Sequence, residues 1–155
     1  MTEFAARGGW WVAAQVPLLA VAIALPLWTA HASGTPSHPV QWLGLALTAG
    51  GLLLALAGVL TLGRALTPYP RPRDSARLRT HGVYRWVRHP VYSGLLVGAF
   101  GWALVWLSVA GVAYALALGV FFDRKARREE RWLRERFPEY AEYERRVRRL
   151  IPGIY

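Results

Sequence analysis

The sequence predicts an all-α integral membrane protein with four transmembrane helices, a C-terminal helical hairpin and a cytoplasmic tail helix. Two observations predict this class. Hydrophobic residues make up 54% of the 155 residues although the formal net charge is +10, and so small a soluble body has too little interior for that much apolar surface. The basic residues are also segregated, because all but Arg7 lie between Arg64 and Arg88 or between Arg124 and Arg149. The intervals between these clusters are almost purely apolar.

Two apolar stretches, at about residues 10–30 and 40–66, are the first expected spans, since each provides the ~20 apolar residues that cross a bilayer. The second stretch is rich in glycine and alanine, which let membrane helices approach closely. The next stretch, residues 91–122, is too long for one crossing. We expect two short helices there, over about 91–107 and 110–123, because a tight hairpin leaves little backbone exposed to lipid.

The basic residues set the expected orientation. The connection over residues 31–39 has no Lys or Arg and should face outward, whereas the loop 67–90 and the tail 124–155 are rich in arginine and should face the cytoplasm. We therefore expect one domain, residues 1–155, that is multi-pass in the inner (cytoplasmic) membrane with both termini cytoplasmic. The alternative for the first span is a cleaved signal peptide, because Ala30-His31-Ala32 has the small-x-small form.

Prolines divide the cytoplasmic part of the chain. Four of them exclude a continuous helix between the second and third spans: Pro68, Pro70, Pro72 and Pro90. The last of these suits the first turn of the third span. The fourth span is expected to continue as a charged helix until Pro138. A short amphipathic helix follows, with Tyr140, Tyr143 and Val147 on one face at helical spacing.

Composition excludes or disfavours several kinds of chemistry. The chain has no cysteine, which excludes a disulfide and a cysteine metal site. No cluster of His, Asp or Glu has metal-ligand spacing, so no metal is expected. The arginines flank the spans, where cytoplasmic retention and attraction to anionic lipid explain them without nucleic acid. No ionisable residue lies deep in the first three spans, which argues against an ion pathway.

The remaining polar residues form two groups that the expected hairpin brings together. The open ends of antiparallel helices joined by a tight turn are neighbours. His89 and Tyr92, at the start of the third span, should therefore lie close to Arg128 and Glu129, at the end of the fourth. A polar pocket at the membrane surface follows, open to a water-soluble cofactor from the cytoplasm and to a lipid-soluble substrate from the bilayer.

Such a pocket has the groups that a sulfonium nucleotide cofactor needs. A carboxylate suits its amino group, an arginine suits its carboxylate, and an aromatic face such as that of Tyr92 suits the sulfonium. Each residue also has a structural reading. The arginines can anchor to lipid phosphate, His89 can cap a helix, and Glu129 and Glu130 can form a solvated, ion-paired face. Spacing by itself leaves both readings open.

Two motifs stand on either side of the expected hairpin. The first is Gly82-x-Tyr84-Arg85-x-Val87-Arg88-His89-Pro90-x-Tyr92-x-Gly94. The second is Glu129-Glu130-x-x-Leu133-x-x-x-Phe137-x-x-Tyr140-x-x-Tyr143-x-x-x-Val147, with a closing Ile151-Pro152. In this order the motifs resemble the isoprenylcysteine carboxyl methyltransferase family, whose relatives include phospholipid methyltransferases. The stretch 66–72 resembles the bacterial branch, and the similarity covers roughly residues 63–152.

The resemblance implies a helical membrane enzyme that holds S-adenosylmethionine between the hairpin entrance and the tail helix and transfers its methyl group at the cytoplasmic face. The implied catalytic residues are Glu129, Arg128 and His89. The implied cofactor-binding residues are Tyr84, Arg88, His89, Pro90, Tyr92, Gly94, Glu129, Glu130, Tyr140 and Tyr143. The methyl acceptor would be lipophilic or a small molecule, with a thiol, carboxylate or amine as its nucleophile, and membrane lipid would be a further partner.

Two other functions compete with methyl transfer. Sterol reductases, membrane enzymes with a nicotinamide cofactor, resemble the same C-terminal region, but a large further set of spans would be expected. A non-enzymatic membrane scaffold would bind no cofactor and would tolerate loss of Glu129 and His89. No oligomeric state follows from the sequence.

Overall fold

The computed structural model of the chain describes residues 8–31, 36–63, 69 and 78–155. Within these residues the regular structure is helical: α2 (Gly9–Trp28), α3 (Pro39–Leu62), the 3-10 helix η2 (Gly82–Arg85), α4 (Pro90–Val105), α5 (Val109–Arg136) and α6 (Tyr140–Arg146). One isolated bridge joins Val87 to Arg148. The prediction of an all-helical protein is thus confirmed for the described part of the chain.

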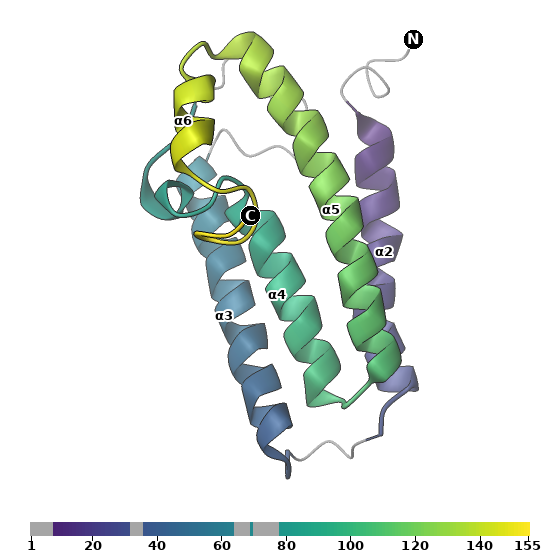
Figure 1. Cartoon of the computed structure of the whole chain (residues 1–155). Coiled ribbons are helices and arrows are strands. Elements are labelled where there is room, and N and C mark those ends of the chain that lie inside the picture. The colour runs from purple at the N-terminus through teal and green to yellow at the C-terminus, as the bar shows by residue number, and fades with distance from the viewer. Residues whose placement is uncertain (1–7, 32–35, 64–68, 70–77) are drawn as a thin grey trace.

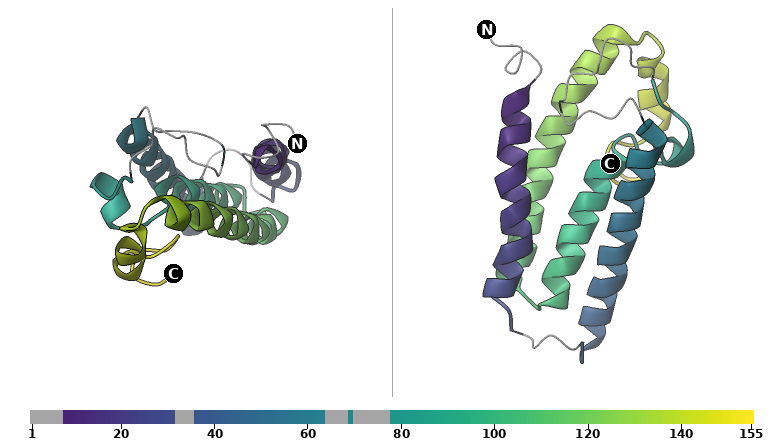
Figure 2. Two further views of the ribbon diagram at one scale, coloured as in Figure 1. Left: turned by 90° about the horizontal axis from the view of Figure 1, so that it is seen from above. Right: turned by 180° about the vertical axis from the view of Figure 1, so that it is seen from behind.

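The four long helices run alongside one another, and η2, α6 and the C-terminal segment gather at one end of them (Figure 1). The view from behind shows α2 next to α5, and α4 between α5 and α3 (Figure 2). α4 and α5 are joined by the three residues 106–108. The charged half of α5 extends past the end of α4 toward α6, as expected for a helix that continues to about Pro138.

Among the helices of the described residues, two are long and apolar enough to cross a membrane. α2 has 20 residues and a mean hydropathy of 1.8 over its most apolar window, and α3 has 24 residues and a value of 2.2. α4 is a shorter apolar helix of 16 residues. Large apolar side chains on α3 point outward, among them Leu53, 67% exposed, and Leu60, 70% exposed. Exposed apolar surface of this extent is costly in water and favourable against lipid.

Some expectations concern residues outside the described ones. These are residues 67, 68 and 70–77 of the loop expected over 67–90, the whole stretch 66–72 apart from Tyr69, the last residues of the span expected over 40–66, and Ala32 of the possible cleavage motif.

Local sequence explains where the helices begin. His38 caps α3, with its ring nitrogen accepting from Val40 N, and Pro39 occupies the first turn. Ser108 caps α5 by accepting from Gly111 N at 2.8 Å. A short polar side chain satisfies an N–H that has no partner inside the helix. Leu107, with a φ of 50°, turns the chain between α4 and α5.

Glycines bring α3 and α4 into direct backbone contact. A Cβ built on Gly51 would lie 2.5 Å from the carbonyl oxygen of Gly94, and one built on Gly44 would lie 2.7 Å from that of Gly101. Only glycine fits at such positions without moving a helix, and close approach of this kind stabilises helix pairs in membranes. Gly44 and Gly51 of the second expected span therefore serve helix packing.

Hydrogen bonds tie the helices together at the end opposite α6. The Gln41 amide donates to the carbonyl of Val105 at 2.9 Å, which joins the start of α3 to the end of α4. The hydroxyls of Thr29 and Ser108 lie 2.6 Å apart and join α2 to α5. Because the ends are fixed, the opposite ends of α4 and α5 are held in register, and this register positions the polar residues described next.

Candidate functional site

The start of α4 and the charged part of α5 meet through four polar side chains. The Tyr92 hydroxyl donates to Oε2 of Glu129 at 3.0 Å. His89 Nε2 lies 3.2 Å from Oε1 of Glu130, and His89 Nδ1 lies 3.7 Å from Oε2 of Glu129. The structure therefore brings together the two residue groups that connectivity predicts to be neighbours. We call Tyr92, His89 and Glu129 the α4–α5 cluster.

Glu130, next to this cluster, is a buried carboxylate that binds two arginines. Its side chain is fully buried and receives Arg88 Nε at 2.9 Å and Arg149 Nη2 at 2.8 Å. Burial favours the neutral carboxyl, but hydrogen bonds from His89 and Arg149 outweigh it and hold the pKa of Glu130 well below its usual range. Glu130 is thus a permanently charged group with its hydrogen-bonding capacity used by the protein itself.

Arg88 fastens the C-terminal tail to the start of α4. Its Nη1 donates to the carbonyls of Glu144 at 3.0 Å and Val147 at 2.5 Å, which the end of α6 leaves without helical partners. The backbone N–H of Arg88 donates to the carbonyl of Arg148 at 2.8 Å, and that of His89 donates to the carbonyl of Arg149 at 3.1 Å. The tail consequently closes over the first turn of α4.

Glu129 uses less of its hydrogen-bonding capacity than the adjacent Glu130 does. Its side chain is 26% exposed, and within the described part of the chain Oε1 has no hydrogen bond. Burial raises the pKa of Glu129, and the charges of His89 and Lys125 oppose the rise without cancelling it. A half-buried carboxylate with an open oxygen can receive a cation or a proton, and the sealed Glu130 cannot.

Three buried tyrosines lie on η2 and α6: Tyr84, Tyr140 and Tyr143. Tyr143 donates its hydroxyl to the carbonyl of Tyr84 at 2.6 Å. Tyr140 is 1% exposed, and among the described residues its hydroxyl has no hydrogen-bond partner. Burial raises the pKa of all three, so each keeps its proton. A buried hydroxyl without a partner is costly, which makes Tyr140 a candidate ligand-binding group.

The Tyr92 ring is already engaged by its neighbours. It stacks on His89 at a centroid distance of 5.3 Å and on Phe122 at 5.0 Å. Lys125 Nζ lies 5.2 Å from the same ring. The hydroxyl of Tyr92, rather than the open aromatic face expected from the sequence, is therefore what this residue offers the site.

Three predicted site residues lie apart from the cluster. Arg128 is exposed, and its guanidinium lies 4.9 Å from the ring of Trp132. Gly94 lies in the contact between α3 and α4. Pro90 is buried in the first turn of α4, where its fixed φ suits the start of a helix. Packing explains the last two, and their assignment to a cofactor stays a prediction.

Two residues of the site were missed by the sequence reasoning. Arg149 pairs with Glu130 and also donates to Asp123 at 3.1 Å, although it lies in the tail beyond α6. Lys125 is 1% exposed and donates to Gln15 of α2, and burial lowers its pKa to about 8. The signal for Lys125 was its place one turn before Glu129; nothing local distinguished Arg149 from the other tail arginines.

Comparisons with known proteins show the family to which the chain belongs. Residues 39–140 match the family model described as phospholipid methyltransferase. A protein of Oryza sativa subsp. indica named "Probable protein-S-isoprenylcysteine O-methyltransferase" is 38% identical over 119 residues, which are 74% of this chain and 62% of that protein. The cobalt-zinc-cadmium resistance protein CzcN of Cupriavidus metallidurans is 39% identical over 111 residues, 71% of this chain and 50% of CzcN.

The fold is also similar to a solved structure. The eukaryotic intramembrane Ras methyltransferase, isoprenylcysteine carboxyl methyltransferase, superposes with a TM-score of 0.70 at 30% sequence identity. The superposition covers 76% of this chain and 43% of that one. The chain thus spans less than two thirds of the length of each of these relatives.

Proposed function

Because the chain belongs to the phospholipid methyltransferase family and is similar to isoprenylcysteine carboxyl methyltransferases, we propose that it is an S-adenosylmethionine-dependent methyltransferase. It works at the cytoplasmic face of the membrane on a lipophilic or small acceptor with a thiol, carboxylate or amine nucleophile. The observation that carries the proposal is the hydrogen bond that joins Tyr92, in the first turn of α4, to Glu129 of α5. This pairing leaves one carboxylate oxygen of Glu129 open, and within the described part of the chain the buried hydroxyl of Tyr140 also has no hydrogen-bond partner.

The residues present fit the cofactor. S-adenosylmethionine supplies a methyl group activated by a positively charged sulfur, and it carries an ammonium, a carboxylate and an adenine. The open oxygen of Glu129 suits the ammonium, since a charge-assisted hydrogen bond is the strong kind. The hydroxyl of Tyr140, which bonds to no other described residue, suits a polar atom of the nucleoside or of the methionine part. Arg128 is exposed and can reach toward a carboxylate.

The chain's own contribution to methyl transfer is positioning and control of a proton. In the transfer, a lone pair of the acceptor forms the bond to the methyl carbon while the carbon–sulfur bond breaks and its electron pair stays on sulfur. An uncharged thiol or amine must also lose its proton. His89 is the group placed to receive it, because its ring nitrogen Nδ1 faces the Glu129 carboxylate at 3.7 Å and this charge would stabilise the protonated ring. The buried ion pair between Glu130 and Arg88 holds the start of α4 against α5 and so fixes the position of His89 and Glu129.

The proposed membrane placement follows the charge pattern. Four crossings, formed by α2, α3, α4 and α5, put both termini on the arginine-rich cytoplasmic side. α4 is about 24 Å long at 1.5 Å per residue, a little short of the ~30 Å hydrocarbon core. Its first residues therefore lie near one interface, where a soluble cofactor and a membrane-embedded acceptor can meet.

Binding of S-adenosylhomocysteine to purified protein in detergent tests the proposal. Glu129→Ala should weaken binding by about 10- to 100-fold, since a hydrogen bond to a charged group is worth ~1.5–3 kcal/mol. His89→Ala should also weaken it. The matched control is Glu135→Ala, which removes an exposed carboxylate from the same helix and should bind as the wild type does.

Unchanged affinity in both Glu129→Ala and His89→Ala would dismiss the assignment of the site. Absence of binding to the wild type would favour a scaffold. Incubating the protein with labelled S-adenosylmethionine and a membrane lipid extract, followed by identification of the labelled product, would then name the acceptor.

A further inference from the structure

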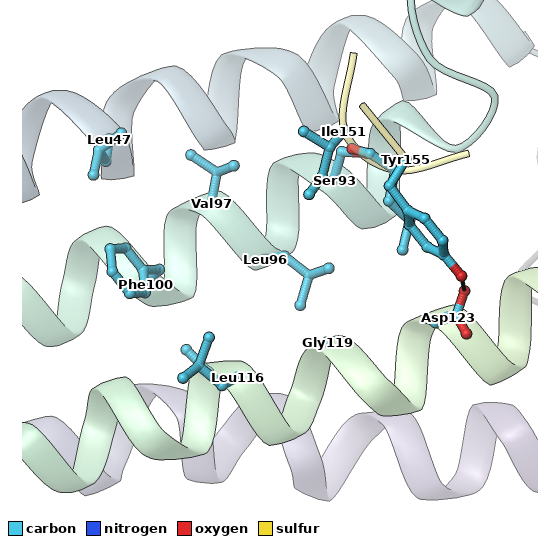
Figure 3. Close-up of a pocket in the computed structure, with 12 residues that line it drawn as sticks. Leu47, Ser93, Leu96, Val97, Phe100, Leu116, Gly119, Asp123, Ile151 and Tyr155 are labelled. Carbon is cyan, nitrogen blue, oxygen red and sulfur yellow. Dashed lines mark hydrogen bonds between the residues drawn. The ribbon is translucent and has the colours of Figure 1, made fainter. Parts of the chain in front are cut away.

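An apolar cavity of about 470 Å³ lies between α3, α4, α5 and the C-terminal segment. Figure 3 shows apolar side chains from the three helices around it, and Asp123 hydrogen-bonded to Tyr155 at one end. The side chains that matter for its shape are Leu47, Leu96, Val97, Phe100, Leu116 and Ile151. Its volume lies within the ~300–1,000 Å³ of ligand pockets.

The cavity is on a different face of α4 from the α4–α5 cluster. Tyr92 points its hydroxyl at Glu129, whereas Ser93, about 100° further round the helix, lines the cavity. The Ser93 hydroxyl is already within hydrogen-bond distance of the carbonyls of His89, at 3.0 Å, and Leu150, at 2.7 Å. The walls thus offer almost no free polar group except at the Asp123 end.

A cavity with such walls suits a hydrocarbon chain. Water does not fill an apolar space, because it would lose its hydrogen bonds there. Three residues that line the cavity are themselves exposed, Val97 at 38%, Leu116 at 65% and Ile151 at 49%, so the cavity opens on the surface expected against lipid. A lipid chain can therefore enter from the side.

The cytoplasmic mouth of the cavity carries an excess of positive charge. Arg127 Nε donates to Asp123 at 2.7 Å, and Arg149 Nη1 donates to the same carboxylate at 3.1 Å. Arg149 is shared with Glu130, which also pairs with Arg88. The same network includes Glu144, which pairs with Arg88, and Arg134, which pairs with Glu130 and Glu144. Four guanidinium groups thus share three carboxylates, an excess of one positive charge. The surplus lies at the surface, since the Arg127 side chain is 59% exposed.

We propose that this cavity binds one acyl chain of an anionic membrane glycerophospholipid, whose phosphate lies against Arg127. The apolar walls select the chain, and the surplus charge at the mouth selects the anionic headgroup. The exposed apolar residues Ile151 and Ile154 stand beside that mouth and suit the interface in which a headgroup lies. This lipid is a resident ligand in addition to any methyl acceptor, so the proposal depends on membrane placement and not on methyl transfer.

A pair of glycine variants tests the chain-binding part. Gly119 lines the cavity, and a Cβ built there would meet only Leu96 Cδ2, at 4.0 Å. Gly119→Leu should therefore fold and fill the cavity. Gly50→Leu is the matched control, because a Cβ on Gly50 meets nothing within 4 Å. Both proteins are purified, exposed to an equimolar mixture of phosphatidylglycerol and phosphatidylcholine in detergent, and weighed intact by native mass spectrometry.

The wild type and Gly50→Leu should retain one phosphatidylglycerol per chain. In Gly119→Leu the occupancy of phosphatidylglycerol should fall by roughly tenfold or more. The methylenes of the acyl chain that are excluded from the filled cavity are no longer buried. Arg127→Gln should still retain one phospholipid per chain but should lose the preference for phosphatidylglycerol over phosphatidylcholine.

Equal retention by Gly119→Leu and Gly50→Leu would overturn the proposal, as would a wild type that retains neither phospholipid. A wild-type dimer in detergent that Gly119→Leu dissociates would also overturn it, because a second copy of the chain would then fill the cavity. S-adenosylhomocysteine affinity, measured on the same samples, should be unchanged in both glycine variants. That measurement reports folding and keeps this result separate from the test of the proposed function.

Discussion

Replacing Glu130 by glutamine should destabilise the protein more than any change at an exposed charge. Glu130 is fully buried and faces Arg88 at 2.9 Å and Arg149 at 2.8 Å. The amide keeps the shape of the side chain but removes the charge, so the buried guanidinium of Arg88 and the partly buried guanidinium of Arg149 lose their shared partner. Removing one partner of a buried ion pair costs about 3–5 kcal/mol, because the remaining charge stays out of water.

The structure places this variant near the lower end of that range. Arg88 keeps a second carboxylate, that of Glu144, at 3.4 Å, and Arg149 keeps Asp123 at 3.1 Å. We therefore expect a loss of about 3 kcal/mol, which lowers the melting temperature by roughly 6–12 °C for a chain of this size. Circular dichroism of the protein in mild detergent during heating measures the change.

The effect of Glu130→Gln should depend on pH. The pKa of Glu130 is lower in the folded than in the unfolded protein, so its stabilisation is complete above the unfolded-state value of ~4.3 and is lost as the pH falls toward the folded-state value. The difference between wild type and variant should thus be constant between about pH 6 and 7 and shrink below about pH 5.

Glu142→Gln is the control for the Glu130 experiment. It removes a half-exposed carboxylate that pairs with Arg145 and Arg146 on the outer side of α6, and exposed ion pairs contribute little. No change in melting temperature is expected. A Glu130→Gln protein as stable as Glu142→Gln at pH 7 would refute the reasoning, since it would show that Glu130 is not the shared partner of the two arginines.

Three further predictions use matched substitutions. Gly51→Leu should lower the melting temperature by clashing with the backbone of α4, at a cost of about 1–3 kcal/mol or more, and Gly50→Leu should leave it unchanged. Tyr143→Phe should cost about 1 kcal/mol in thermal unfolding, because its hydroxyl donates to a carbonyl of η2, whereas Tyr140→Phe should cost no stability but weaken S-adenosylhomocysteine binding in calorimetry. Lys125 has a folded-state pKa of about 8, which is below its pKa in the unfolded chain, so above pH 8 the unfolded state binds more protons than the folded state. The stability of the protein to denaturant should therefore rise between about pH 8 and 10. Lys125→Met should abolish this rise.

Much of the fold could be predicted from neighbouring residues. The alternation of apolar stretches with arginine clusters predicts helices over 10–30 and 40–66, and α2 and α3 lie there. Pro90 predicts the start of α4, and Pro138 predicts the end of α5. Helix periodicity, capping and proline geometry depend on residues within a few positions of one another, so the sequence shows them directly.

Connectivity predicted that the polar residues at the start of α4 and those of α5 lie close together. It did not predict that Glu129 and Glu130 have different surroundings. Glu129 and Glu130 are adjacent in sequence and look alike. Because successive residues on a helix are turned by about 100°, one faces Tyr92 with an open oxygen and the other is sealed by Arg88 and Arg149.

Sequence alone determined the helical class, most helix limits and the meeting of His89 and Tyr92 with the paired glutamates, since these depend on local pattern and on short connections. Tertiary structure decided that Arg149 returns to Glu130 and that Lys125 reaches Gln15, 110 positions away. It also decided that the Tyr140 hydroxyl is buried without a partner among the described residues. These outcomes depend on how the tail closes over α4 and how α2 packs on α5. Contacts between distant segments are set by the summed packing of whole helices, which no local pattern records.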